Sequence, residues 1–161
     1  MAGKLIIDEN HLSKLPVRER LDVCVSVLKK DSDESSRWDA VWLAGEIAEA
    51  NPHTAIFDEV ADLMVWVLEN DDNGIVKHEA CYQIAALNMR KKIPNLIRTA
   101  LTDKSIIARH EAIEALGLIG AFDSREFLFQ ATNDSNPEIK ETAHLVLKRL
   151  ERLEKLERMN K

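Results

Sequence analysis

Lys77-His78-Glu79-Ala80 and Arg109-His110-Glu111-Ala112 are two copies of one short phrase, and they decide the fold. Each copy has a basic residue, a His-Glu pair and then the start of an apolar pattern with helical spacing. The copies lie 110 − 78 = 32 residues apart, which is the length of one two-helix repeat. The sequence therefore predicts a helical repeat protein in which the two pairs occupy equivalent places on neighbouring repeats.

The composition supports a helical protein of one domain. The chain has 161 residues, of which 45% are hydrophobic, 31% charged and only 5% aromatic. This length is sufficient for a real core, and the low content of aromatic residues, glycine and proline favours helices over sheets. The hydrophobic and charged fractions are those of a soluble globular protein, not of a disordered chain.

Charge and cysteine content limit the partners and the cellular compartment that we expect for the protein. The net charge is −6 and no basic block stands out, which argues against nucleic-acid binding. The start of the chain reads as neither a signal peptide nor a membrane anchor, and no run approaches the ~18 apolar residues of a membrane span. With only Cys24 and Cys81, we expect free thiols in a reducing compartment, and therefore a cytoplasmic protein.

Apolar residues recur every three or four positions in eight segments, which predicts eight helices joined by tight turns. A weakly ordered arm over residues 1–13 precedes them. Thr54 is expected to cap the third helix, Gly120 to end the sixth, and Asp123-Ser124 to cap the seventh. The expected helices cover residues 17–30, 37–50, 54–70, 75–89, 94–101, 106–119, the segment up to 131, and 138–161.

The second helices of four hairpins align on a small residue. Ala40, Ala80, Ala112 and Ala143 follow one another at intervals of 40, 32 and 31 residues, and glycines stand five positions after the first and third of these alanines, where helices need close approach. The fold class is therefore all-α, an α-solenoid of about four hairpins in one domain, with the second helices lining the concave face. The expected repeats are 14–50, 54–89, 92–119 and 123–161, and the long final helix is either a solvated cap or a contact with another subunit.

We call the two residues directly before each aligned alanine the pair position. Only in the two central repeats is the pair position occupied by His-Glu. The four pair positions hold Trp38-Asp39, His78-Glu79, His110-Glu111 and Glu141-Thr142 in turn. Imidazole and carboxylate together suit Fe(II), Mn(II) or Zn(II), and open sites of this kind are typical of non-haem iron that activates oxygen. The predicted metal ligands are His78, Glu79, His110 and Glu111, and the two glutamates are also the candidate catalytic residues.

The ligand count leaves alternatives open. Two histidines and two glutamates can hold one metal, whereas a di-iron centre needs roughly twice as many ligands. A symmetric homodimer would supply them across its interface. In the simplest alternative each His-Glu pair only begins a helix, with the glutamate favoured by the helix dipole and the histidine exposed.

The remaining candidates are assigned to structure. Cys81 lies three positions after His78 and is expected in the core. The other histidines are expected at the surface or in packing contacts, and the tryptophans in the core or in a subunit contact rather than stacked on a substrate. These residues are His11, His53, His144, Trp38, Trp42 and Trp66.

Two stretches resemble deoxyhypusine hydroxylase, a family of HEAT-repeat proteins. They are Val76-Lys77-His78-Glu79-Ala80 and Ala108-Arg109-His110-Glu111-Ala112-Ile113-Glu114-Ala115-Leu116-Gly117. The similarity extends through Ile93-Pro94-Asn95-Leu96 to Leu147-Lys148-Arg149-Leu150-Glu151 and covers residues 37–153. The second phrase also occurs, more loosely, in related HEAT-like repeat proteins such as phycobilin lyases, so it does not identify a substrate.

The resemblance implies more than the residues do. The family has two such halves with four His-Glu pairs that hold two irons, and it uses O₂ to hydroxylate the deoxyhypusine side chain of a translation factor. This chain resembles one half, with two pairs, and Ala85 stands where the second phrase has Gly117. The implied function is an iron-dependent monooxygenase of hypusine biosynthesis that acts as a homodimer on a basic protein substrate. The alternatives are a non-catalytic HEAT-repeat scaffold, and a metal or oxygen carrier or sensor without hydroxylase activity.

Overall fold

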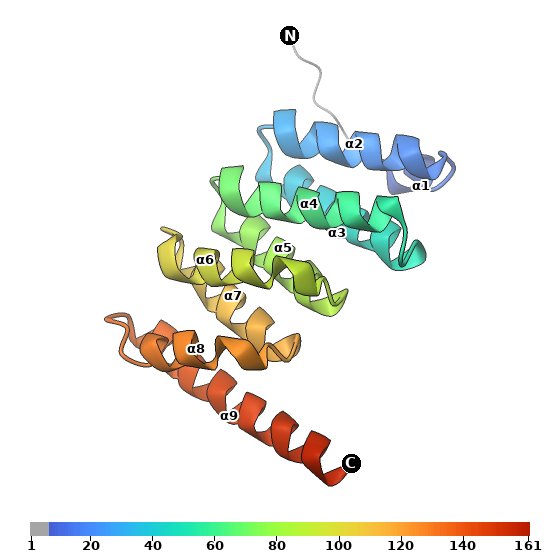
Figure 1. Cartoon of the computed structure of the whole chain (residues 1–161). Helices are drawn as coiled ribbons and strands as arrows, with labels where there is room; N and C mark the ends of the chain where they lie inside the picture. Colours follow the sequence, from blue (N-terminus) through green and yellow to red (C-terminus); the bar gives the residue numbers. More distant parts are fainter. Residues whose placement is uncertain (1–6) are drawn as a thin grey trace. The chain divides into compact units, whose positions relative to one another are not determined.

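A computed structural model describes residues 7–161, and within that range every regular element is a helix. In Figure 1 the chain reverses direction from one main helix to the next. The helices are α1 (Glu9–Leu12), α2 (Val17–Lys30), α3 (Glu34–Ala50), α4 (Ala55–Asn70), α5 (Gly74–Ala86), η1 (Arg90–Lys92), α6 (Ile93–Thr102), α7 (Ile106–Leu118), η2 (Phe122–Ser124), α8 (Arg125–Ala131) and α9 (Pro137–Met159).

The predicted fold class, an all-α solenoid of about four helical hairpins, is confirmed. The hairpins are α2 with α3, α4 with α5, α6 with α7, and α8 with α9. The chain divides into two compact units, residues 1–83 and residues 84–161, and the boundary falls inside α5. The organisation of the whole chain as one domain stays a prediction.

Each unit has a core of aliphatic side chains between its helices. In unit 1, α3 packs against both α2 and α4, and Leu21, Val41 and Met64 are fully buried between them. In unit 2, α7 packs against α6 and α9, and α8 packs against α9. The fully buried side chains there include Leu96, Ile113, Leu116, Leu128, Ile139 and Leu150.

A repeated three-residue turn precedes the second helix of each hairpin. Its first residue is an aspartate whose carboxylate accepts a hydrogen bond from the backbone N–H of the third residue, at 2.8–2.9 Å in all four turns. The third residue then caps the helix through its own side chain, which satisfies N–H groups that have no partner inside the helix. These turns begin at Asp31, Asp71, Asp103 and Asp134, so their intervals (40, 32 and 31) are those of the aligned alanines.

A residue in the left-handed backbone conformation follows each of the two helices that carry a His-Glu pair. Gly120 has φ +66°, and the N–H of Ala121 bonds back to the carbonyl of Leu116 at 3.0 Å. Asn88 has φ +53°. The equivalent hydrogen bond follows it, from the N–H of Met89 to the carbonyl of Ile84 at 2.9 Å. Gly120 therefore closes its helix as expected, while α5 ends three residues before the expected Met89, because asparagine tolerates this conformation.

Three expectations about helix ends need correction. The second predicted helix begins at Glu34 instead of residue 37, because Asp33 caps it. Asp123-Ser124 does not cap α8: both residues lie in η2, and the Ser124 side chain is 2% exposed and makes no capping bond. Part of the expected arm is helical, since Glu9–Leu12 forms α1 on an Asp8 cap. Residues 1–6 lie outside the described residues.

The basic residue before the pair position is structural. Arg37 donates from Nε to Asp71 Oδ2 at 2.8 Å and from Nη1 to the carbonyl of Asp31 at 3.1 Å. Arg109 donates from Nε to the carbonyl of Ala100 at 2.8 Å and pairs through Nη2 with Asp134. Each arginine thus joins the first turn of a second helix to the aspartate that opens the next repeated turn, which holds consecutive hairpins together.

The Arg109–Asp134 pair makes part of the stability depend on pH. The hydrogen bond from Arg109 lowers the pKa of the Asp134 carboxyl below its ordinary 3.8. A carboxyl with a depressed pKa stabilises the fold above the unfolded-state pKa, and this contribution is lost as the pH falls through the folded-state value. We expect Asp134→Asn to lose about 1.5–3 kcal/mol at pH 7 and to lose less further stability than the wild type on acidification below pH ~4.

Urea unfolding of the wild type and of Asp134→Asn, at pH 7 and at several pH values below 4, measures both the loss of stability and its dependence on pH. Asp123→Asn, at an exposed carboxyl in the same unit, is the control and is expected to follow the wild-type curve. An Asp134→Asn curve parallel to that of the wild type would contradict the assignment.

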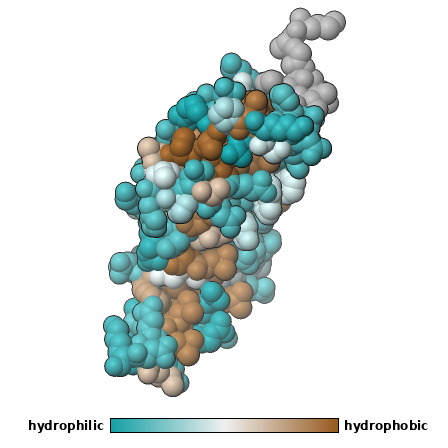
Figure 2. Space-filling model, turned by 90° about the vertical axis from the view of Figure 1, so that its right-hand side faces the viewer, coloured by the Kyte–Doolittle hydropathy of each residue, from teal (hydrophilic) through white to brown (hydrophobic). Residues whose placement is uncertain are grey.

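Several large apolar side chains reach the surface. Trp38 and Trp42, one turn apart on α3, are 41% and 44% exposed. Of the two expected locations, the core is therefore excluded for both residues, and a subunit contact stays a prediction. Figure 2 shows hydrophobic surface exposed between hydrophilic side chains on the face it presents. Among residues 7–161, no helix combines the length and the apolar composition that a membrane span requires.

Candidate metal centre

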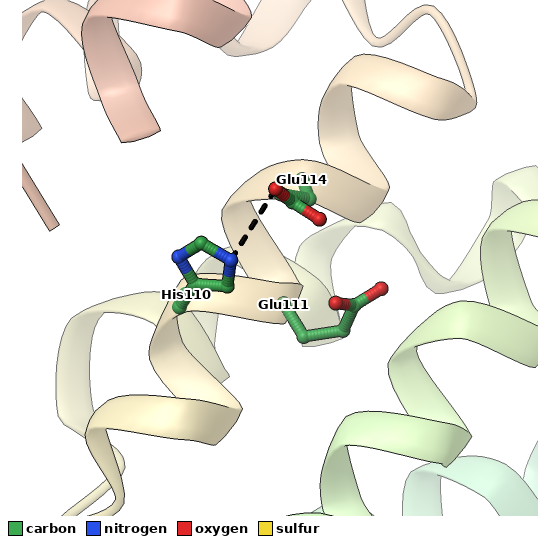
Figure 3. A group of neighbouring side chains, drawn as sticks. All are labelled: His110, Glu111 and Glu114. Atoms are coloured by element: carbon green, nitrogen blue, oxygen red, sulfur yellow. Dashed lines mark ion pairs between the residues drawn. The ribbon is translucent and has the colours of Figure 1, made fainter. Parts of the chain in front are cut away.

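Three ligand-type side chains gather on α7. One ligand atom from each of His110, Glu111 and Glu114 can be chosen so that all three lie within 4.8 Å of one another. Figure 3 shows the three side chains projecting from the same stretch of the helix, with a dashed line between His110 and Glu114. This is the single group of three or more such residues among residues 7–161.

Helix geometry explains the cluster. Residues three and four apart share one face of a helix, so Glu114 lies beside both Glu111 and His110. The imidazole Nε2 of His110 is 3.3 Å from Glu114 Oε1. Glu111 is the most buried of the three, at 4% exposed, whereas the side chains of His110 and Glu114 are 28% and 38% exposed. The cluster therefore reaches from the buried interior to the surface.

The second ring nitrogen of His110 is held from another helix. Nδ1 lies 2.8 Å from the hydroxyl Oγ1 of Thr142 on α9, and that hydroxyl is 2.7 Å from the carbonyl of Glu138 one turn earlier. The two nitrogens of His110 thus have different neighbours, a hydroxyl at Nδ1 and a carboxylate at Nε2.

The donor set fits a transition metal. Ligand atoms about 2.1 Å from one metal lie at most about 4.2 Å apart, so a cluster spread over 4.8 Å needs only small side-chain movements to close around an ion. One imidazole and two carboxylates suit Fe(II), Mn(II) or Zn(II). A backing hydrogen bond on the free nitrogen of a ligating histidine is the usual arrangement in metal sites.

The first His-Glu pair lies on α5, in unit 1. Glu79 is 7% exposed, and its Oε1 accepts a hydrogen bond from Gln83 Nε2 at 3.0 Å. The Gln83 amide in turn occupies the space beside Gly45, where an added Cβ would lie 2.1 Å from Gln83 Oε1. The absence of a side chain at residue 45 therefore leaves room for the group that orients Glu79, which confirms the close approach expected there.

The structure brings together only part of the predicted set. His110 and Glu111 lie together, but in unit 2, whereas His78 and Glu79 belong to unit 1, so a centre shared by all four stays a prediction. Glu114 was missed, although its place four residues after His110 and three after Glu111 was a usable signal. Tyr82 stands at the corresponding place of the first phrase.

The other candidates keep structural roles. Cys24 and Cys81 are buried thiols that form no disulfide, as expected, and burial raises the pKa of the Cys24 thiol to about 11. His11, His53 and His144 are exposed, and none belongs to the cluster on α7.

Comparison with known families agrees with the repeat pattern. A family model for HEAT repeats matches residues 61–148, which is 148 − 61 + 1 = 88 of the 161 residues. The chain belongs to the HEAT-repeat family. The match includes both His-Glu phrases of this HEAT-repeat protein.

The curated relatives include several deoxyhypusine hydroxylases. The one from Bos taurus is 39% identical over 83 residues, covering 51% of this chain and 27% of the relative. The one from Arabidopsis thaliana is 28% identical over 132 residues, covering 80% of this chain and 39% of the relative. The matched segments of the HEAT-repeat chain thus cover well under half the length of these relatives.

A solved structure extends the similarity to the fold. Human deoxyhypusine hydroxylase, solved in complex with glycerol, matches with a TM-score of 0.71 and 26% sequence identity. The match covers 90% of this chain and 48% of the human chain. The predicted resemblance to one half of a deoxyhypusine hydroxylase is therefore confirmed.

Proposed function

We propose that this protein is an iron-dependent hydroxylase of the deoxyhypusine hydroxylase type, and that its metal centre is completed by homodimerisation. The observation that carries the proposal is the cluster of His110, Glu111 and Glu114 on α7, whose ligand atoms lie within 4.8 Å of one another. It stands in a chain whose relatives include deoxyhypusine hydroxylases. The proposed substrate is the deoxyhypusine side chain of a basic translation factor.

The two histidines and the two glutamates of the His-Glu pairs would have different roles. His78 and His110 would bind metal through nitrogen. Glu79 and Glu111, both nearly buried, would bind or bridge it or orient the other ligands. Bound iron would supply the activation of O₂ that hydroxylation requires. The carboxylates around the centre would also attract the cationic amine of an aminoalkyl substrate.

Homodimerisation follows from ligand number. One chain offers two His-Glu pairs, and di-iron carboxylate proteins draw their ligands from four helices. A two-fold dimer would bring four pairs together, and an isologous interface places equivalent residues of both copies around the symmetry axis. The proposal therefore joins metal content to oligomeric state.

Elemental analysis of untagged protein, together with light-scattering mass on the same sample, tests the proposal. We expect about one iron per chain in a dimer, and O₂-dependent hydroxylation of a deoxyhypusine-containing translation factor. Chelation of the iron should abolish the activity, and added Fe(II) should restore it. A metal-free monomer that takes up no added Fe(II) would contradict the proposal.

A non-catalytic scaffold is the second candidate. HEAT repeats match the chain, repeat proteins present extended binding surfaces, and the exposed Trp38 and Trp42 on α3 are residues typical of protein interfaces. This function predicts partner binding that survives His78→Ala. A metal-loaded protein that hydroxylates no substrate would instead indicate a metal or oxygen carrier, or a sensor.

A further inference from the structure

The hydroxyl of Thr142 has one proton, and its surroundings decide where that proton points. Oγ1 lies 2.7 Å from the carbonyl oxygen of Glu138, and a carbonyl can only accept. The hydroxyl therefore donates to Glu138, as threonines within helices often do to the carbonyl four residues earlier. Towards His110, at 2.8 Å, it is left to act as an acceptor.

An acceptor at Nδ1 requires a proton on that nitrogen. We propose that Thr142 positions His110 by accepting its Nδ1–H, so that Nε2 is the nitrogen presented to a metal ion. This inference rests on the proposed metal-binding function. Nε2 is the nitrogen that faces Glu114, at 3.3 Å, so the ring is oriented towards the carboxylate side of the cluster. Thr142 is a positioning residue, because it acts through His110 and touches no metal itself.

Burial makes this hydrogen bond effective. Thr142 is 5% exposed, so water competes little for its hydroxyl, and it belongs to α9, which packs along α7. The ring of His110 is thus held between two helices, while the Glu114 side chain is partly exposed to solvent.

The repeat explains why the last pair position lacks His-Glu. Thr142 occupies the place in its repeat that Glu111 occupies in the repeat before, directly ahead of the aligned alanine. Both side chains are nearly buried. In the last repeat this place supports the histidine of the preceding repeat, 142 − 110 = 32 residues earlier, and contributes no ligand.

Thr142→Val tests the inference, because valine keeps the shape and removes the hydroxyl. Loss of the partner of a ligating histidine typically weakens metal affinity about 10–100-fold, and we expect a change of that size in Zn(II) or Fe(II) titrations of the full chain. Thr142→Ser should bind as the wild type does. Thr132→Val is the matched control, since Thr132 is 7% exposed and its hydroxyl also donates to a backbone carbonyl.

Nitrogen NMR of His110 gives a readout that needs no metal. We expect Nδ1 to be protonated in the metal-free wild type and the Nδ1 resonance to shift in Thr142→Val but not in Thr132→Val. An unprotonated Nδ1 in the wild type, or wild-type affinity in Thr142→Val, would overturn the inference. A wild-type chain that binds no metal but keeps the Nδ1 proton would contradict the proposed function and still support the proton assignment.

Discussion

Replacing Arg37 by methionine is expected to lower the free energy of unfolding by about 3–5 kcal/mol, the usual cost of removing one partner of a buried ion pair. Arg37 makes two hydrogen bonds to Asp71, whose side chain is 1% exposed. These bonds raise the pKa of the Arg37 guanidinium. Methionine fills a similar volume but leaves the Asp71 carboxylate buried without its counter-charge, and urea unfolding measures the loss.

A surface pair in the same unit is the matched control. Arg18 and Glu59 also form two hydrogen bonds, but both side chains are about half exposed. Solvent and salt screen an exposed pair of this kind, so it contributes little to stability, and Arg18→Met should change the free energy of unfolding little. Arg37→Met with Asp71→Asn should recover part of the loss, because the unpaired charge is gone. Equal losses in Arg37→Met and Arg18→Met would contradict the structural role of Arg37.

Arg37 also shows what the repeated phrase means. The basic residue of the phrase is present in the first repeat, where no His-Glu pair follows it, and there it joins consecutive hairpins through Asp71. Arg109 does the same through Asp134 in unit 2. The basic residue therefore belongs to the fold, whereas the His-Glu pair is confined to the central repeats. One phrase combines a structural requirement with a candidate site.

Much of the fold was predictable because local patterns carry it. Apolar spacing predicted the eight main helices, and the intervals between aligned alanines predicted the hairpins. The helix ends were less certain: α5 stops at Ala86 because Asn88 adopts a left-handed conformation, which most asparagines do not. The aspartate turns were readable as well, since they recur at the same intervals as the alanines.

The site was less predictable because its contacts are not local. His110 and Glu111 were evident as a pair, and Glu114 could have been added from helical spacing. Thr142 could not be assigned from spacing alone, because its contact with His110 depends on how α9 packs along α7. The burial of Glu79 beside Gln83 likewise depends on the space left at Gly45. Periodicity places such residues on a helix, and packing decides what they touch.

His110→Ala is expected to weaken metal binding by more than about 100-fold, beyond what loss of an outer hydrogen-bond partner costs. His110 is the one nitrogen ligand of the cluster on α7, and its removal leaves two carboxylates, which suit Mg(II) or Mn(II) better than Zn(II). The helices should persist, because His110 is partly exposed and the alanine that replaces it favours a helix. Metal content by elemental analysis and helicity by circular dichroism measure the two effects.

The exposed His144 on α9 provides the control, and His144→Ala should keep the metal content of the wild type. His78→Ala distinguishes the arrangements of the centre. Loss of metal in both His78→Ala and His110→Ala is the result expected if the two His-Glu pairs serve one centre. Loss in His110→Ala alone would mean that unit 2 binds metal without the first pair. Full metal retention in His110→Ala would leave the cluster on α7 as surface charge at an ordinary helix, and the hydroxylase proposal would lose the observation that carries it.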